Sequence, residues 1–172
     1  MARKPANGNQ AGHQQAPSDR DKIIAALLAL LAEHPIERIG YTDIAARAGV
    51  SLAALRGEFP SLLAIYAAHV KEIDRKVLAG GDADVAEEPP RERLFDVLMR
   101  RIEALAPHKA AIRSLARSAT RDPALAVALN GLTVRSMQWM LTAADISAGA
   151  EGHPARAGAR AALRLSAAHL AR

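Results

Sequence analysis

The stretch that decides the fold spans residues 41–59 and reads Tyr-Thr-Asp-Ile-Ala-Ala-Arg-Ala-Gly-Val-Ser-Leu-Ala-Ala-Leu-Arg-Gly-Glu-Phe. Its first half has the spacing of a short helix. Thr42 is a suitable N-cap, since its hydroxyl can accept from a backbone N–H that lacks a helical partner. Gly49 stands where a left-handed residue commonly ends a helix. The small apolar face between them consists of Ile44, Ala45 and Ala48.

The second half predicts another short helix directly after a tight turn. Ser51 can cap this helix, which we expect to run from Leu52 to about Glu58 and to bury Leu52 and Leu55. Two short helices joined in this way are typical of a helix-turn-helix, which places its second helix in the major groove of DNA. The alternative is a helical hairpin of the core with a chance turn sequence.

The remainder of the chain also shows helical spacing, and no segment shows the alternation of a strand. Ser18, Ser61 and the pair Asp122-Pro123 are helix starts of the expected kind. The sequence therefore predicts an all-α protein. We expect a disordered tail over 1–17, a three-helix DNA-binding domain over 18–60, and a helical ligand-binding and dimerisation domain over 61–172.

Residues 19–79 resemble the N-terminal domain of TetR-family transcriptional regulators. The resemblance rests on the segments Ile23-Ile24-Ala25-Ala26, Thr42-Asp43-Ile44-Ala45, Ala48-Gly49-Val50-Ser51 and Phe59-Pro60-Ser61, followed by a long helix. It implies a TetR-like fold and a ligand-responsive repressor that binds a palindromic operator in double-stranded DNA as a homodimer. The DNA-contacting residues would be Lys22, Thr42, Arg47, Ser51, Leu52, Ala53 and Arg56.

Two positions differ from the pattern of that family. Arg56 stands where relatives usually have Tyr, and Leu62 stands where they usually have Lys. Arg56 can contact a phosphate or bond to a guanine edge, whereas Leu62 can make no ionic contact. Arg56 is therefore the residue we expect to contact a base.

The resemblance also implies a pocket for a small apolar effector in the C-terminal half. The adaptable apolar side chains that could form its walls are Phe95, Met99, Met137, Trp139 and Met140. The alternative, plain core packing, stays open because spacing alone shows no cavity. His69 is likewise interpreted as a core histidine, with a role in sensing a ligand as the alternative.

The charge of the chain lies mainly in its C-terminal part. Residues 91–172 carry thirteen Lys/Arg against six Asp/Glu, and residues 1–60 carry seven against six. Cations recur every fourth residue at Lys109, Arg113, Arg117 and Arg121, and again at Arg156, Arg160 and Arg164. These edges are either solvated helix faces or surfaces for an anionic membrane or partner.

A second resemblance supports the interpretation of these basic edges as a surface for an anionic membrane. The stretch 94–146 includes Asp122-Pro123 and Met137-Gln138-Trp139-Met140-Leu141. It is similar to the ubiquinone-biosynthesis lipid-binding family, which shares the TetR fold and lacks DNA binding. The alternative function is therefore a lipid- or quinone-pathway binding protein, which would meet a membrane surface. TetR-like chains commonly end in two long helices that form the dimer, and only one is expected after the loop at 147–153. Either the last helix is missing or the dimer is built differently.

Several classes of function find no support in the residues. The chain has no cysteine, which excludes disulfides and thiolate metal sites, and its six histidines show no metal-ligand spacing. No phosphate loop or catalytic motif is present, so we expect neither an enzyme nor a cofactor. The longest apolar run, Ile23 to Ala32, is too short to span a bilayer, and no signal peptide is evident. A cytoplasmic location is the resulting expectation.

Overall fold

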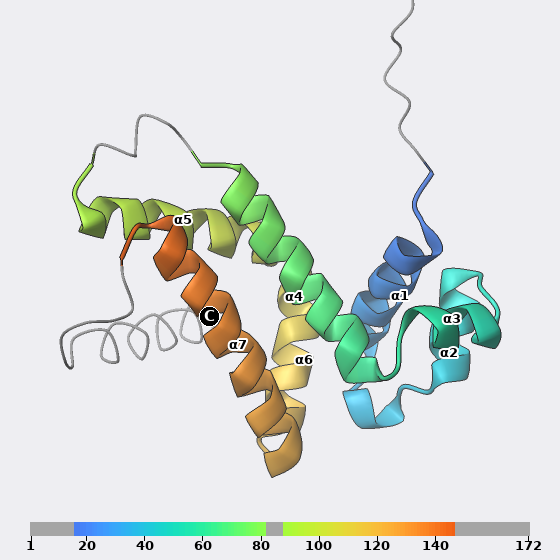
Figure 1. Cartoon of the computed structure of the whole chain (residues 1–172). Coiled ribbons are helices and arrows are strands. Elements are labelled where there is room, and N and C mark those ends of the chain that lie inside the picture. The colour runs from blue at the N-terminus through green and yellow to red at the C-terminus, as the bar shows by residue number, and fades with distance from the viewer. Residues whose placement is uncertain (1–15, 82–87, 147–172) are drawn as a thin grey trace, which may run out of the picture.

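The computed structural model describes residues 16–81 and 88–146, and over these ranges the chain is helical with no strand (Figure 1). The all-α prediction is confirmed. The expected disordered tail, the loop at 147–153 and the last helix fall outside the described residues, apart from residues 16 and 17. The described elements are α1 (Asp19–Glu33), η1 (Ile36–Arg38), α2 (Tyr41–Ala48), α3 (Leu52–Glu58), α4 (Leu62–Ala79), α5 (Pro90–Leu105), η3 (Ala106–His108), α6 (Lys109–Ala119) and α7 (Pro123–Ala143).

The first three helices form the helix-turn-helix unit (α1–α3), which lies at one end of the molecule (Figure 1). Helix α1 begins with a capping box, because the Ser18 hydroxyl accepts from the Asp21 N–H and the Asp21 carboxylate accepts from the Ser18 N–H. Its buried stripe includes Ile23, Ile24, Leu27, Leu28 and Leu31. This stripe holds α2, α3 and the start of α4 in one core.

The expected cap of α2 is wrong. The helix begins at Tyr41 with Gly40 as its N-cap, and Thr42 lies exposed in the first turn. The Asp43 carboxylate accepts from the Gly40 N–H at 2.9 Å. A carboxylate in the first turn bonds this N–H and also favours the positive end of the helix, so Asp43 takes the role that Thr42 was expected to play.

The expected burial of Leu52 is also wrong. Leu55 is 2% exposed, whereas Leu52 is 49% exposed. Helix α3 is only seven residues long, and only the side that faces α1 and α2 is covered. Leu55 occupies that face and Leu52 lies beside it.

Helix α4 connects the helix-turn-helix unit to the helical body (α5–α7), and it runs between them through the middle of the molecule (Figure 1). One buried cluster joins α1–α4 to α6 through Ala111 and Leu115. A second, smaller cluster lies between α4, α5 and α7 and contains Ile73, Val77, Val97 and Met140. The body is therefore packed against both α1 and α4.

The buried face of α5 differs from the face that carries the predicted pocket residues. Phe95 and Met99 are exposed, and Val97 and Arg101 are buried instead. Helix α5 carries apolar residues over more than one face, and only the side turned to α4 and α7 is covered. Arg101 is drawn to that side by an ion pair with Asp74 of α4 at 2.6 Å. Spacing alone could not select this face, because it ranks an arginine as a surface residue.

Candidate nucleic-acid interface

The turn between α2 and α3 has the geometry that the glycine and serine positions predicted. Gly49 adopts the left-handed conformation with φ 67° and ψ 34°. The Val50 N–H then donates to the Ala45 carbonyl at 3.0 Å, and the Ser51 hydroxyl accepts from the Ala54 N–H at 3.1 Å. These bonds close the end of α2 and the start of α3, so the angle between the two helices is set by local chemistry.

Helix α3 has one buried side and one exposed side. Leu55 faces the core, and the side chains of Leu52, Ala53 and Arg56 are exposed. An arginine can donate two bonds to a guanine edge, and small apolar side chains can contact a thymine methyl group. The exposed side of α3 therefore carries the chemistry of a major-groove contact, with one cation and little other polarity.

Most cations of the helix-turn-helix unit are held in ion pairs. Arg47 on α2 binds both carboxylate oxygens of Glu33 on α1, with distances of 3.0 and 2.7 Å. Lys22 pairs with Asp19 at 2.9 Å, and Arg20 pairs with Glu58 at 3.5 Å. Arg56 makes no ion pair with any described residue. The hydrogen bonds from Arg47 lower the pKa of Glu33, and Glu33 in turn raises the pKa of Arg47.

These pairings separate the sequence-predicted DNA residues into two groups. Thr42, Ser51, Leu52, Ala53 and Arg56 are exposed around α2 and α3 and are free of ion pairs within the described chain. Lys22 and Arg47 each hold a carboxylate, so a phosphate would have to compete with Asp19 or Glu33 for them. The exposed end of the unit is therefore less cationic than the residue types alone suggested.

The helix-turn-helix unit is attached to α6 by two serines that sequence reasoning missed. Ser114 donates to the His34 carbonyl, directly after α1, at 3.1 Å. Ser118 donates to the Glu37 carboxylate in η1 at 3.0 Å. Both serines are buried, and their spacing of four residues beside the buried Leu115 was the available signal. These two hydrogen bonds tie α6 to the segment that follows α1.

The residues predicted to line an effector pocket are not brought together. Phe95, Met99 and Trp139 are exposed, Met140 is fully buried in the smaller core cluster, and Met137 packs against that cluster. Met140 and Met137 thus serve as core, the alternative that the sequence left open. Only Trp139 of this set lines the groove described next.

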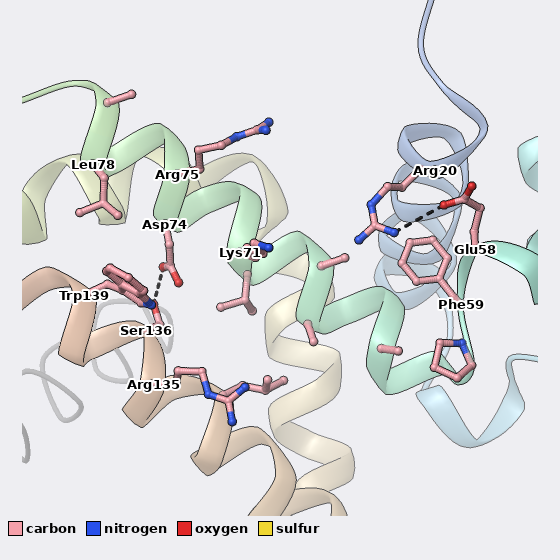
Figure 2. A pocket seen from close by; sticks show the side chains of 17 residues that line it. Arg20, Glu58, Phe59, Lys71, Asp74, Arg75, Leu78, Arg135, Ser136 and Trp139 are labelled. Atoms are coloured by element: carbon pink, nitrogen blue, oxygen red, sulfur yellow. Dashed lines mark hydrogen bonds and ion pairs between the residues drawn. The ribbon is translucent and has the colours of Figure 1, made fainter.

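A groove of about 910 Å³ lies between α4 and α7 and reaches the turn between α3 and α4 (Figure 2). Its apolar lining includes Ala64, Ala67, Val70, Leu78, Leu132 and Trp139. Leu78 and Trp139 lie at one end, and Arg20, Glu58 and Phe59 lie at the other end (Figure 2). This volume is within the range of pockets that hold small molecules.

The predicted basic edge of α6 is not a uniform solvated stripe. Lys109 and Arg113 are half-buried, and Arg113 interacts within the described chain. Arg117 is exposed on α6, and Arg121 is exposed beyond the end of the helix. The second set, Arg156, Arg160 and Arg164, lies outside the described residues.

In residues 16–81 and 88–146 no group of three or more His, Asp or Glu side chains is placed to hold a metal ion. No helix there is long and apolar enough to cross a membrane. His69 is buried, and its ring meets the His108 ring edge-on with centroids 4.5 Å apart. Burial, more than the nearby His108, Lys76 and Arg101, lowers the pKa of His69 to about 4.

The fold agrees with that of solved regulators, although the sequence similarity is low. The crystal structure of a TetR transcriptional regulator from Rhodococcus sp. RHA1 is 24% identical, with a TM-score of 0.54, over 89% of this chain and 81% of that chain. A tetR-family transcriptional regulator from Streptomyces coelicolor is 20% identical, with a TM-score of 0.52, over 88% and 71% of the two chains. No family model matches the chain, and no curated protein matches it. The described helices thus have the fold of TetR transcriptional regulators, as the helix-turn-helix sequence predicted.

Proposed function

We propose that this chain is a DNA-binding transcriptional regulator of the TetR type. It would act in the cytoplasm as an effector-responsive repressor, bind a palindromic operator as a homodimer, and have no catalytic activity. The likeness to solved regulators supports the fold on which the proposal is built. The contacts with DNA and with an effector are our proposal.

The observation that carries the proposal is the exposed side of α3. Leu52, Ala53 and Arg56 stand out from a helix whose opposite side is fixed in the core by Leu55. A seven-residue helix held rigidly by caps and an αL turn fits the recognition element of a helix-turn-helix. Such a helix presents its exposed side chains to base edges without bending.

Each exposed residue has a role that follows from its chemistry. Arg56 would bond to a guanine edge, and Leu52 and Ala53 would contact thymine methyl groups. Thr42 and Ser51 would donate hydroxyl bonds to phosphates, which position the unit on the duplex. Lys22 and Arg47 would contribute only where a phosphate replaces their present carboxylate partners.

The test is selection of duplexes from a random pool by the full chain, followed by affinity measurements at several salt concentrations. Counterion release requires that true duplex binding weaken as salt rises. We expect Arg56→Ala to cost about 1–3 kcal/mol on the preferred duplex and to relax preference at one position of each half-site. The matched control is Arg91→Ala, which removes an exposed cation from α5, far from the helix-turn-helix unit.

The outcomes separate the two candidate functions. A palindromic preference that is lost in Arg56→Ala and kept in Arg91→Ala supports the regulator. Absence of duplex binding by a folded protein contradicts it and favours the lipid- or quinone-pathway alternative on the same fold. Equal losses in the two variants would show that Arg56 acts only through its charge.

A further inference from the structure

Helix α7 is the longest of the described helices, and it carries almost no charge. Over its 21 residues Arg135 is the only ionisable side chain, whereas α5 has seven charged residues in sixteen. A helix face that meets water normally carries charged side chains, and a helix that is apolar on all sides is normally covered on all sides. The composition of α7 therefore indicates a helix whose outer side is covered when the protein is at work.

The described chain covers only one side of α7. The buried residues of this helix are Ser136 and Met140. Val127 and Val134 lie roughly half a turn away from them and are 73% and 44% exposed. Exposed valines opposite a buried serine reverse the usual distribution of these residue types between surface and core. This reversal indicates that the exposed side of α7 has a partner of its own.

The exposed side is a continuous strip, which we call the outer face of α7. It consists of Val127, Gly131, Val134 and Gln138, all of them exposed. Their spacing of four, three and four residues places them on one side of the helix. Trp139 extends the apolar surface toward the groove and is 54% exposed.

Gly131 lies in the middle of the outer face, and the described chain gives no reason for a glycine there. A Cβ at this position would meet no atom within 4 Å, and the backbone of Gly131 is not left-handed. A glycine inside a helix is destabilising relative to alanine. Glycine does allow a second backbone to approach closely. Gly131 therefore marks a place where another helix can pack directly against α7.

The charge of the chain favours a second copy as that partner. The whole chain carries a net charge of +5, so two copies repel each other over most of their surfaces. In a two-fold contact, moreover, the same patch is used by both subunits, and a charged patch would repel itself. The outer face of α7 has no charged residue and avoids this repulsion. It also offers no counter-charge to an acidic or basic partner.

The size of the face agrees with a dimer contact that extends beyond a single helix. Helix α7 is about 31 Å long. A stable contact involves roughly 20–30 residues on each side, which is more than the outer face supplies. Leu78 on α4 is also exposed and lies with Trp139 at one end of the groove, next to α7 (Figure 2). These two side chains provide further apolar area beside the outer face.

We propose that the outer face of α7 packs against α7 of a second copy, with the two helices crossing at Gly131. Val127 and Val134 of each copy pack on either side of the crossing, and Trp139 lies at its edge. This inference rests on the homodimer of the proposed function and names its contact. It corresponds to the alternative, left open by the sequence, that the dimer is built differently. It does not depend on DNA binding.

Sedimentation equilibrium of the full chain measures the dissociation constant of the dimer. We expect Val134→Glu to raise this constant about a hundredfold, because it brings two carboxylates together in an apolar contact. Gly131→Leu should also weaken the dimer, although it favours the helix within one copy. The matched control is Phe95→Glu, which puts the same charge on an apolar residue of α5 that is 62% exposed, and it should leave the dimer unchanged. Circular dichroism confirms that each variant is folded.

The absence of cysteine allows a direct test of the crossing point. Mild oxidation of a Gly131→Cys chain should link two copies by a disulfide, because the two Cα atoms then lie within about 7 Å of each other. A Phe95→Cys chain treated in the same way should stay unlinked.

Three results would overturn the proposal. They are a native chain that is monomeric at all concentrations, equal weakening of the dimer by Val134→Glu and Phe95→Glu, and no disulfide in the Gly131→Cys chain. The first result would leave residues 147–172, which follow α7, as the segment that covers the outer face. A dimer through α7 that binds no duplex would contradict only the proposed function. A duplex-binding dimer that is insensitive to Val134→Glu would contradict only the contact proposed for α7.

Discussion

The carboxylate of Asp74 on α4 accepts from the guanidinium of Arg101 on α5 at 2.6 Å, and both residues are more than nine-tenths buried. Ser136 on α7 donates to the same carboxylate oxygen. Helices α4, α5 and α7 thus meet at one carboxylate. A buried ion pair of this kind holds specific partners together, although an apolar replacement of the whole pair can be equally stable.

Removing one partner of this pair should strongly destabilise the protein. We expect Asp74→Ala to lower the free energy of unfolding by about 3–5 kcal/mol, because it leaves the Arg101 guanidinium buried without a counter-charge. Urea denaturation followed by circular dichroism measures the loss. The double variant Asp74→Leu/Arg101→Met should recover most of it, and a double variant no more stable than Asp74→Ala would contradict this reading.

Two glycines of the helix-turn-helix unit, Gly49 and Gly57, should respond to alanine in opposite directions. Gly49 has φ 67° and open space around its missing side chain, so Gly49→Ala should cost about 1–2 kcal/mol through backbone strain alone. Gly57 lies within α3 with nothing near it, so Gly57→Ala should stabilise by about 0.5–1 kcal/mol. The midpoints of urea denaturation compare the two variants. A shift in the same direction for both would contradict the backbone effects predicted for Gly49 and Gly57.

Substitutions at two leucines of α3 should affect different properties, stability at Leu55 and DNA binding at Leu52. Leu55→Ala removes a side chain from the core and should cost about 2–5 kcal/mol. Leu52→Ala acts on an exposed side chain and should change stability by less than about 0.5 kcal/mol. If α3 contacts DNA, Leu52→Ala should still weaken duplex binding. A folded Leu52→Ala protein with unchanged affinity for its preferred duplex would remove Leu52 from the interface.

The buried His69 should make stability depend on pH. Its pKa is lowered from 6.5 to about 4, first by burial and then by His108, Lys76 and Arg101, with the Tyr66 ring also close by. The unfolded chain therefore takes up a proton more readily, and stability falls as pH drops through this window. The folded protein should lose about 2 kcal/mol from His69 between about pH 7 and about pH 5.

The measurement is urea denaturation at the two pH values for the native chain and for His69→Leu. The variant should lose less stability on acidification, because its side chain takes up no proton. His34→Gln serves as the control, since the His34 ring is about half exposed. An unchanged pH dependence in His69→Leu would show that other groups, His108 first among them, cause the loss.

Part of the site could be predicted from sequence because it depends on local chemistry. The αL turn at Gly49 and the caps at Ser18, Ser51, Ser61 and Asp122 were all found where expected. Each of these features depends on a side chain or a backbone angle that affects only residues a few positions away in the chain. The wrong cap prediction at Thr42 also concerns local chemistry, because the carboxylate of the neighbouring Asp43 accepts from the Gly40 N–H.

The sequence by itself determined the helices, most of the caps and the helix-turn-helix, since spacing and capping act over one or two turns. Only the tertiary structure decided which face of α5 is buried, because that depends on Arg101 reaching Asp74 on another helix. It likewise decided that Arg47 is held by Glu33 and that Lys71 and Arg135 border one groove. Contacts between residues far apart in the chain arise from packing in three dimensions, and no periodicity along the sequence encodes them.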